Sequence, residues 1–268
     1  MKRIWMICML TFLVGVSFAQ KANPSGSNNK TTQNSVKSKK EGQDNPKTTA
    51  PKQNTPKEST TTVEPKPTAN ASSCPDNRHP HLIDLGLPSG TKWACCNVGA
   101  STPEGYGDYY SWGETSTRSN YSWKTYSHCK GSANTCTKLG SDITGTNYDV
   151  ARKKWGGSWK MPTIKQFLEL SKRCRHTLVT VNGVNGRKFT GPNGKSIFLP
   201  FAGSKFGTES GNVGNNGYYW SSNSNLSNVG EAYYLFVTTS GYAGRSYYYR
   251  YYGHSIRPVQ RPAINKKK

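Results

Sequence analysis

The strongest indication of architecture comes from two aromatic segments, Gly217-Tyr-Tyr-Trp-Ser-Ser222 and Tyr247-Tyr-Tyr-Arg-Tyr-Tyr-Gly-His-Ser-Ile-Arg-Pro-Val259. Aromatic residues favour strands because their rings pack well on a pleated surface. Alternate residues of a strand face opposite sides of a sheet, so we expect one subset of these rings to fill a core and another to lie on a face. The two segments therefore predict an aromatic-rich sheet near the end of the chain.

Other short strands are expected around turn signals. The segments 81–87 and 91–98 read as strands on either side of the turn Pro88-Ser89-Gly90, and 186–199 reads as a hairpin around Gly191-Pro192-Asn193-Gly194. Further strands are expected at Tyr218–Ser221, Ala232–Thr238 and Arg245–Arg257.

Two helices are expected among these strands. The stretch from Tyr148 to Trp155 can form two helical turns, with Gly156-Gly157 ending it. Thr163 and Gln166 have the spacing of a capping box at the start of a second helix. The buried face of that helix is expected to carry Phe167, Leu170, Ser171 and Cys174. This order of elements predicts an α+β fold that is loop-rich, with mainly antiparallel short strands.

The N-terminal residues 1–19 have the pattern of a signal peptide. Lys2 and Arg3 precede an apolar run, Ile4–Val16, and a small-x-small site at Ser17-Phe-Ala19. A retained anchor is the alternative, but the run is shorter than the roughly 20 residues that span a bilayer. We therefore expect an exported protein, located in the periplasm, on the cell surface or outside the cell, with no transmembrane segment after cleavage.

Residues 20–73 are predicted to form a disordered tether. This segment contains no aromatic residue and is filled with Lys, Thr, Asn, Ser and Pro, so it cannot bury enough apolar surface to offset the entropy of ordering. The remainder is expected to form one domain, 74–259, followed by a basic tail, 260–268.

The chain carries a formal net charge of +22. Within 152–188 only Glu169 opposes a run of cations, which suggests one basic surface. It is either a solvated face that aids solubility or a site for anions. The cations are Arg152, Lys153, Lys154, Lys160, Lys165, Lys172, Arg173, Arg175, Arg187 and Lys188.

The cysteines point to disulfides. Removal of Cys8 with the signal peptide leaves an even number in an exported domain, where disulfides are the usual outcome. Six cysteines allow fifteen pairings. Cys129 with Cys136 would close a short loop, and Cys95 and Cys96, as neighbours in a strand, should take different partners. We predict the pairs Cys129–Cys136, Cys96–Cys174 and Cys74–Cys95. No spacing typical of a zinc site occurs, so we expect no metal and no cofactor.

Six motifs follow one another along the domain, and they are Asp84–Trp93, Tyr106–Glu114, Trp155–Thr163, Ile197–Gly203, Gly217–Ser222 and Tyr252–Val259. In this order they closely resemble the Fibrobacter major paralogous domain. The resemblance covers His81 to Val259 and implies an exported domain with a fold related to C-type-lectin-like proteins and formylglycine-generating enzymes. That family is common in exported proteins of gut and oral Bacteroidetes-like bacteria.

The resemblance brings no catalytic residues. The chain has Trp93-Ala94-Cys95-Cys96 where the family usually has Trp-Ala-Thr-Cys, and this extra thiol is a reason to pair Cys95 with Cys74. The calcium-binding triplets of lectins, Glu-Pro-Asn and Trp-Asn-Asp, are absent from the sequence. Calcium-mediated sugar binding is therefore not expected.

The candidate ligand-binding residues are Tyr219, Tyr248, Tyr251 and Arg250, which would form a Tyr-rich face suited to stacking on sugar rings. The tryptophans inside the family motifs are expected to pack in the core instead. These are Trp93, Trp112, Trp155, Trp159 and Trp220.

An enzyme is not expected. His128, His176 and His254 are scattered and have no nucleophile with an orienting acid. Arg257 is expected to pair with a buried acid, such as Asp108 or Glu114, and to have a structural role.

The sequence thus predicts an exported, non-enzymatic binding or adhesion module that recognises extracellular carbohydrate or an anionic envelope polymer. Nucleic acid is not expected as a partner, because export separates the protein from the nucleic acid of the cell. The alternative is a structural component of the envelope or of a surface appendage that packs on a protein partner.

Overall fold

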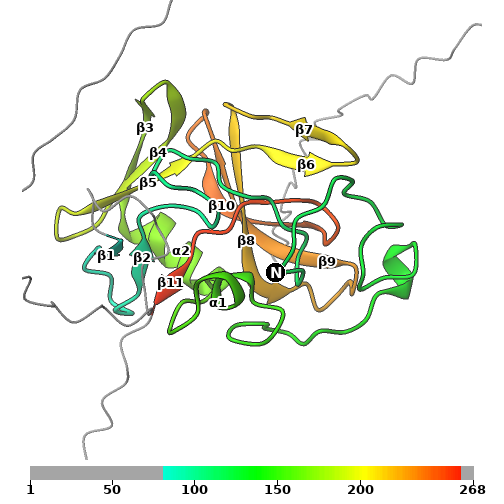
Figure 1. Cartoon of the computed structure of the whole chain (residues 1–268). Coiled ribbons are helices and arrows are strands. Elements are labelled where there is room, and N and C mark those ends of the chain that lie inside the picture. Colours follow the sequence, from blue (N-terminus) through cyan, green and yellow to red (C-terminus); the bar gives the residue numbers. More distant parts are fainter. Residues whose placement is uncertain (1–80, 261–268) are drawn as a thin grey trace, which may run out of the picture. The chain divides into compact units, whose positions relative to one another are not determined.

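The computed structural model describes residues 81–260, which form an α+β arrangement of short, mostly antiparallel strands and two α-helices (Figure 1). The expected α+β class is confirmed at this level. The predicted signal peptide (1–19) and tether (20–73) lie outside the described residues, as do Cys74 and the tail from residue 261 onward. Within 81–260 there is no helix whose length and apolar content would let it cross a membrane.

The helical elements are η1 (Ala133–Thr135), α1 (Val150–Trp155) and α2 (Ile164–Arg173). The strands are β1 (Leu82–Asp84), β2 (Lys92–Ala94), β3 (Arg175–Val181), β4 (Val184–Thr190), β5 (Ser196–Pro200), β6 (Ser204–Phe206), β7 (Glu209–Gly211), β8 (Asn216–Ser224), β9 (Glu231–Thr238), β10 (Ala243–Tyr249) and β11 (Val259–Gln260).

These strands form small sheets with the orders β1-β2-β11, β10-β9-β8, β3-β4-β5 and β6-β7. In the first sheet Trp93 of β2 lies opposite Ile83 on one side and Val259 on the other. The earliest and latest strands of the described part therefore both pair with β2, one on each side of it. The predicted hairpin at 186–199 is confirmed as β4 and β5, in which Phe189 lies opposite Ile197.

Helix α2 begins at the predicted capping box. The Thr163 side chain accepts a hydrogen bond from the backbone N–H of Gln166, and the Gln166 side chain accepts one from the N–H of Thr163. Phe167 and Leu170 are the fully buried positions of the helix, which packs against β8, β9, β10 and β3. The sequence pattern therefore predicted the start of this helix and most of its buried face; Cys174 is buried just after the helix ends, and Ser171 is only half-buried.

Strand β8 is buried on both sides. Tyr219 belongs to the hydrophobic cluster that α2 covers, together with Leu235. Its neighbour Trp220 belongs to a second cluster with Trp112. The indole N–H of Trp112 donates to the Ser221 carbonyl at 2.9 Å, and that of Trp220 donates to the Tyr110 carbonyl at 2.8 Å. These two bonds attach the loop around Trp112 to the sheet.

The motif tryptophans are core residues, as expected. Trp93, Trp112, Trp159 and Trp220 are at most 2% exposed. Trp155 is half-buried and meets Trp159 edge to face, with 5.1 Å between ring centroids.

The predicted strand Arg245–Arg257 is shorter than expected. It ends at Tyr249, because Arg250 turns inward and the Tyr252 N–H bonds back to the Tyr249 carbonyl at 3.2 Å. The residues that follow form no continuous strand and pair with other segments only through isolated β-bridges, such as that of His254 with Tyr110. Strands β3, β6 and β7 were not predicted, although the positive φ of Asn182 and Gly183 marks the β3–β4 turn.

One predicted disulfide is confirmed and one is wrong. Cys129 and Cys136 are bonded. Cys174 is buried and carries a free thiol in the cluster beneath α2, whereas Cys96 lies in a different cluster, so the pair Cys96–Cys174 does not form. Burial raises the pKa of the Cys174 thiol to about 11. The pair Cys74–Cys95 stays a prediction, because Cys74 is outside the described residues.

His254 is fully buried among aromatic rings. Its Nδ1 donates to the Gly253 carbonyl at 3.0 Å, and Nε2 has no hydrogen-bond partner among the described residues. The His254 ring stacks on the Tyr218 ring, with 5.2 Å between their centroids, and its centroid lies 4.2 Å from that of the Trp220 ring. Burial lowers the pKa of His254 to about 3, so the imidazole is neutral at physiological pH.

We predict that His254 makes the fold sensitive to acid. Its pKa in the folded state lies below the unfolded value, so the unfolded chain takes up the proton first, and stability is lost as pH falls from about 6.5 towards 3. The slope from this group approaches about 1.4 kcal/mol per pH unit. The free energy of unfolding can be measured in urea at several pH values between 7 and 5. It should fall less steeply with decreasing pH in His254→Gln than in the wild type.

NMR gives a second test that does not depend on how stable the variant is. The His254 ring signals of the wild type should not titrate between pH 7 and 5 while the protein stays folded. A titration near the ordinary histidine pKa would contradict the buried, neutral state.

The disulfide should stabilise the loop that it closes. Its cysteines are 7 residues apart, and loop-closure entropy for this length corresponds to about 2.5 kcal/mol. Thermal unfolding of the Cys129→Ser/Cys136→Ser variant should show a loss of this order. Reductant should destabilise the wild type by about this amount more than it destabilises the variant; equal stability of the oxidised wild type and the variant would refute this role.

Candidate functional site

Of the four candidate ligand-binding residues, two lie at the surface and two in the interior. Tyr248 is 44% exposed, and Tyr251 is half-buried. Tyr219 is fully buried, and its hydroxyl donates to the Pro200 carbonyl, while Arg250 is 1% exposed. The prediction that Tyr219 and Arg250 lie on an exposed face is therefore wrong.

Tyr248 and Tyr251 belong to a group of adjoining rings, which we call the aromatic patch. The Trp123 ring meets Tyr251 edge to face at 4.6 Å and Tyr249 at 5.3 Å. Tyr252 lies 4.8 Å from Tyr248 and 4.7 Å from Tyr251. All members are half-buried or exposed, and they are Trp123, Phe206, Tyr248, Tyr249, Tyr251 and Tyr252.

Three separate segments build this patch: the loop that contains Trp123, the end of β6 at Phe206, and the end of β10 with the turn that follows it. Rings that are held by neighbouring rings lose little further freedom when a ligand arrives, which favours binding. The patch can therefore offer apolar ring surface and phenolic hydroxyls to one partner.

Three hydroxyls of the patch, those of Tyr248, Tyr251 and Tyr252, remain protonated at neutral pH. Burial raises the pKa of Tyr252 to about 12 and also raises the pKa values of Tyr248 and Tyr251. Each phenol can therefore donate as well as accept a hydrogen bond, as sugar hydroxyls require of their partners.

Arg250 lies in the interior and anchors the turn that carries part of the patch. Its guanidinium lies 4.2 Å from the centre of the Trp112 ring, and it donates to the carbonyls of Glu231 at 3.2 Å and Thr137 at 3.3 Å. These contacts hold the turn from which Tyr251 reaches the surface. Arg250 thus has a structural role.

Trp123 and Phe206 were missed as candidate residues. Trp123 is the tryptophan of the domain that lies outside the family motifs, and this was the available signal. Phe206 gave none, because it sits in a short strand that was not predicted.

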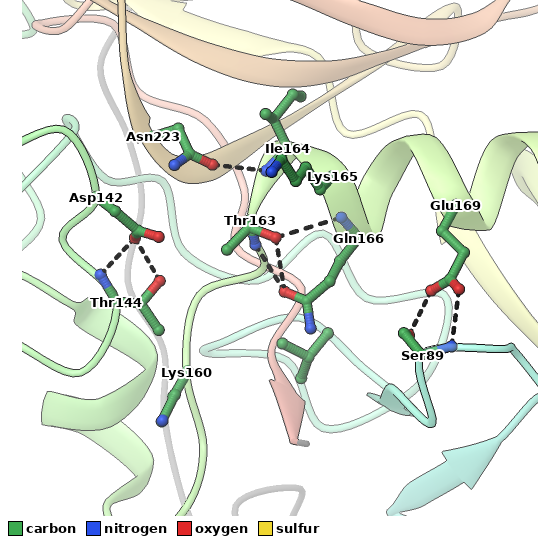
Figure 2. A pocket seen from close by; sticks show the side chains of 11 residues that line it. Ser89, Asp142, Thr144, Lys160, Thr163, Ile164, Lys165, Gln166, Glu169 and Asn223 are labelled. Carbon is green, nitrogen blue, oxygen red and sulfur yellow. Dashed lines mark hydrogen bonds between the residues drawn. The ribbon is translucent and has the colours of Figure 1, made fainter. Parts of the chain in front are cut away.

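A second feature is a polar groove of about 650 Å³ beside the start of α2 (Figure 2). Figure 2 shows Asp142 and Thr144 on one side, Ser89 and Glu169 on the other, and Thr163 with Gln166 between them. Lys160, Lys165, Ile164, Asn223 and Val259 complete the lining.

The structure does not pair Arg257 with the predicted acids. Its fully buried guanidinium donates to Asn97 at 2.8 Å and to main-chain carbonyls, including that of Phe198 at 2.9 Å. Asp108 is exposed, and the buried Glu114 carboxylate accepts hydrogen bonds from Arg118 and the Ser127 N–H. The role of Arg257 is structural, as expected, but its partners are different.

The three candidate histidines, His128, His176 and His254, have different neighbours. His128 meets the Gly113 carbonyl and the Tyr148 ring, and His176 meets Arg187. His254 is enclosed by rings, as described above. Within residues 81–260 no group of three or more His, Cys, Asp and Glu side chains is placed to hold a metal ion.

The predicted basic surface loses one member. Arg187 is 4% exposed and donates to the Thr238 carbonyl at 2.8 Å. Lys160 is half-buried in the groove. The remaining members are exposed, and they are Arg152, Lys153, Lys154, Lys165, Lys172, Arg173, Arg175 and Lys188.

Comparison of the chain with models of protein families, with curated proteins and with solved structures finds no match.

We predict that substitutions separate the core tyrosine from the surface tyrosine. Tyr219→Ala removes a fully buried ring and should cost about 3–5 kcal/mol, whereas Tyr248→Ala should cost less than about 1 kcal/mol. Tyr219→Phe, which loses only the hydroxyl bond to Pro200, should cost about 1 kcal/mol. Chemical unfolding measures all three, and equal costs for the two alanine variants would contradict the assignment.

Proposed function

We propose that this chain is an exported, non-enzymatic binding or adhesion module that recognises extracellular carbohydrate through the aromatic patch. The observation that carries the proposal is the contact of Trp123 with Tyr249 and Tyr251 at ring distances of 5.3 and 4.6 Å, at a surface that also presents Tyr248. Exposed apolar surface of this kind is typical of binding sites.

Sugars suit this surface because they have two kinds of face. The C–H groups of a sugar ring can stack on an aromatic ring, while its hydroxyls need partners that both donate and accept. The patch supplies both, since the phenols of Tyr251 and Tyr252 remain protonated at neutral pH. An exported module of this kind would bind without a cofactor.

We further propose that the chain belongs to the Fibrobacter major paralogous domain family and has a C-type-lectin-like fold. Support comes from the order of the six motifs and from two α-helices set among short antiparallel strands. The motif residues Trp93, Trp112 and Trp220 are fully buried, as expected of residues that a fold requires.

A second candidate function is a structural component of the envelope or of a surface appendage. The aromatic patch also favours this function, because tyrosine and tryptophan are enriched at protein interfaces. Anionic envelope polymers are a further candidate ligand, which the exposed cations of α1 and α2 favour.

Two substitutions test the carbohydrate proposal. Tyr248→Ala and Tyr251→Ala in the full mature chain should each lower the affinity for a bound polysaccharide by about tenfold, the value of a ring contact worth about 1.4 kcal/mol. A glycan array identifies the ligand, and calorimetry gives the affinities. Tyr242→Ala is the matched control, since Tyr242 is 50% exposed and lies outside the patch.

The alternatives give different results. A stoichiometric protein partner, with no glycan bound, would favour the structural component. Binding only to polyanions, lost as salt rises, would indicate that the net charge acts without a specific site. Undiminished glycan binding by both patch variants would refute the patch as the site.

A further inference from the structure

The polar groove beside α2 continues into a second hollow of about 260 Å³. Ile164 and Asn223 line both, so the two hollows adjoin. The second hollow ends at Tyr233 and at the exposed Leu226. Together they provide an extended binding surface rather than a single closed pocket.

The lining of the groove contains both charged hydrogen-bond donors and charged acceptors, two of each. Lys160 and Lys165 form no ion pair with any of the residues 81–260, so both ammonium groups can donate to a ligand. The carboxylates of Asp142 and Glu169 supply acceptors opposite them. Two cations and two anions give the lining itself no net formal charge, so its own side chains do not select for an anionic ligand.

Both acids are held in place by hydrogen bonds, Glu169 of α2 from the turn at Ser89 and Asp142 from its own loop. Glu169 accepts from the Ser89 N–H at 2.9 Å, and Asp142 accepts from the Thr144 N–H at 2.9 Å. Burial raises the pKa of Asp142, but the hydrogen bonds from Thr144, Ser222 and Asn223 together outweigh it, so the pKa lies below its ordinary value and the group is charged. The Asp142 carboxylate is therefore a fixed acceptor at neutral pH.

Two of the N–H groups at the start of α2 already have side-chain partners. The Asn223 side chain accepts from the Ile164 N–H at 2.8 Å, and the Thr163 side chain accepts from the N–H of Gln166 (Figure 2). Anion binding at a helix start uses the N–H groups of the first turn, so fewer of them are left for a phosphate here.

The far end of the groove has aromatic character. Tyr233 lies opposite Tyr247 in the β9–β10 pair, with ring centroids 5.9 Å apart and the rings edge to face. The Arg245 guanidinium lies 5.3 Å from the centre of the Tyr233 ring. Tyr247 is 53% exposed, so its ring can stack on a ligand that leaves the second hollow.

We propose that a neutral, hydroxyl-rich glycan chain lies along this groove, from Ser89 and Glu169 at one end to Tyr233 and Tyr247 at the other. Each hydroxyl of such a chain both donates and accepts, which matches the mixed lining, and one sugar ring stacks on Tyr247. This inference rests on the proposed carbohydrate function and adds a second site, with the class of its ligand, to the aromatic patch.

The experiment compares groove variants with a matched control in the full mature chain. Lys160→Met/Lys165→Met removes the two donors and keeps side-chain length, Tyr247→Ala removes the stacking ring, and Lys154→Met removes an exposed cation of α1 outside the groove. The probes are soluble β-glucan, mannan and xylan, with polygalacturonate as the acidic comparison, at low and high salt.

We expect one of the neutral polysaccharides to bind. Its affinity should fall about tenfold in the double lysine variant and about tenfold in Tyr247→Ala, and should be unchanged in Lys154→Met. The loss in the lysine variant should be the same at low and high salt, because hydrogen bonds to a neutral ligand are not screened as ion pairs are.

Three results would overturn the inference in distinguishable ways. If the groove variants bind as the wild type does while Tyr251→Ala binds weakly, the groove is not a site and the patch alone binds. If only polygalacturonate binds and high salt releases it, the ligand is anionic. If no polysaccharide binds the wild type, the proposed function fails together with the groove.

Discussion

The fold depends on the buried guanidinium of Arg257, which joins three parts of the chain. It donates to the carbonyls of Ala94 and Cys95 at the end of β2, to Phe198 in β5, and to the Asn97 side chain. Few side chains can satisfy so many acceptors from one point, because arginine presents five donors in a rigid plane. Burial of such a charge is tolerated only when its donors are occupied, so these segments are held at fixed positions.

Arg250 is a second buried arginine that joins separate segments, and it lies at the turn that carries the aromatic patch. Its charge lies against the Trp112 ring, and its donors reach the carbonyls of Glu231 and Thr137. Thr137, which follows the disulfide-closed loop, and Glu231 of β9 are thereby joined to the turn after β10. The turn that carries Tyr251 and Tyr252 is thus anchored by a buried cation.

Local signals were sufficient for several elements. The Thr163–Gln166 capping box predicted α2, and the turn Gly191–Gly194 predicted the β4–β5 hairpin. The order of these elements correctly predicted an α+β fold with antiparallel strands. The signals failed at β3, where the turn at Asn182-Gly183 was overlooked, and at β6 and β7, which are three residues each and depend on their surroundings.

The sequence alone therefore determined the class of fold, the capped helix and the Cys129–Cys136 loop, because each depends on residues close together in the chain. Tertiary structure decided which aromatic rings are exposed. Alternation in β8 separates Tyr219 from Trp220, but both are buried, since α2 covers one face of the strand and the loop around Trp112 covers the other. The polar groove likewise joins segments distant in sequence, and no local pattern specifies such an assembly.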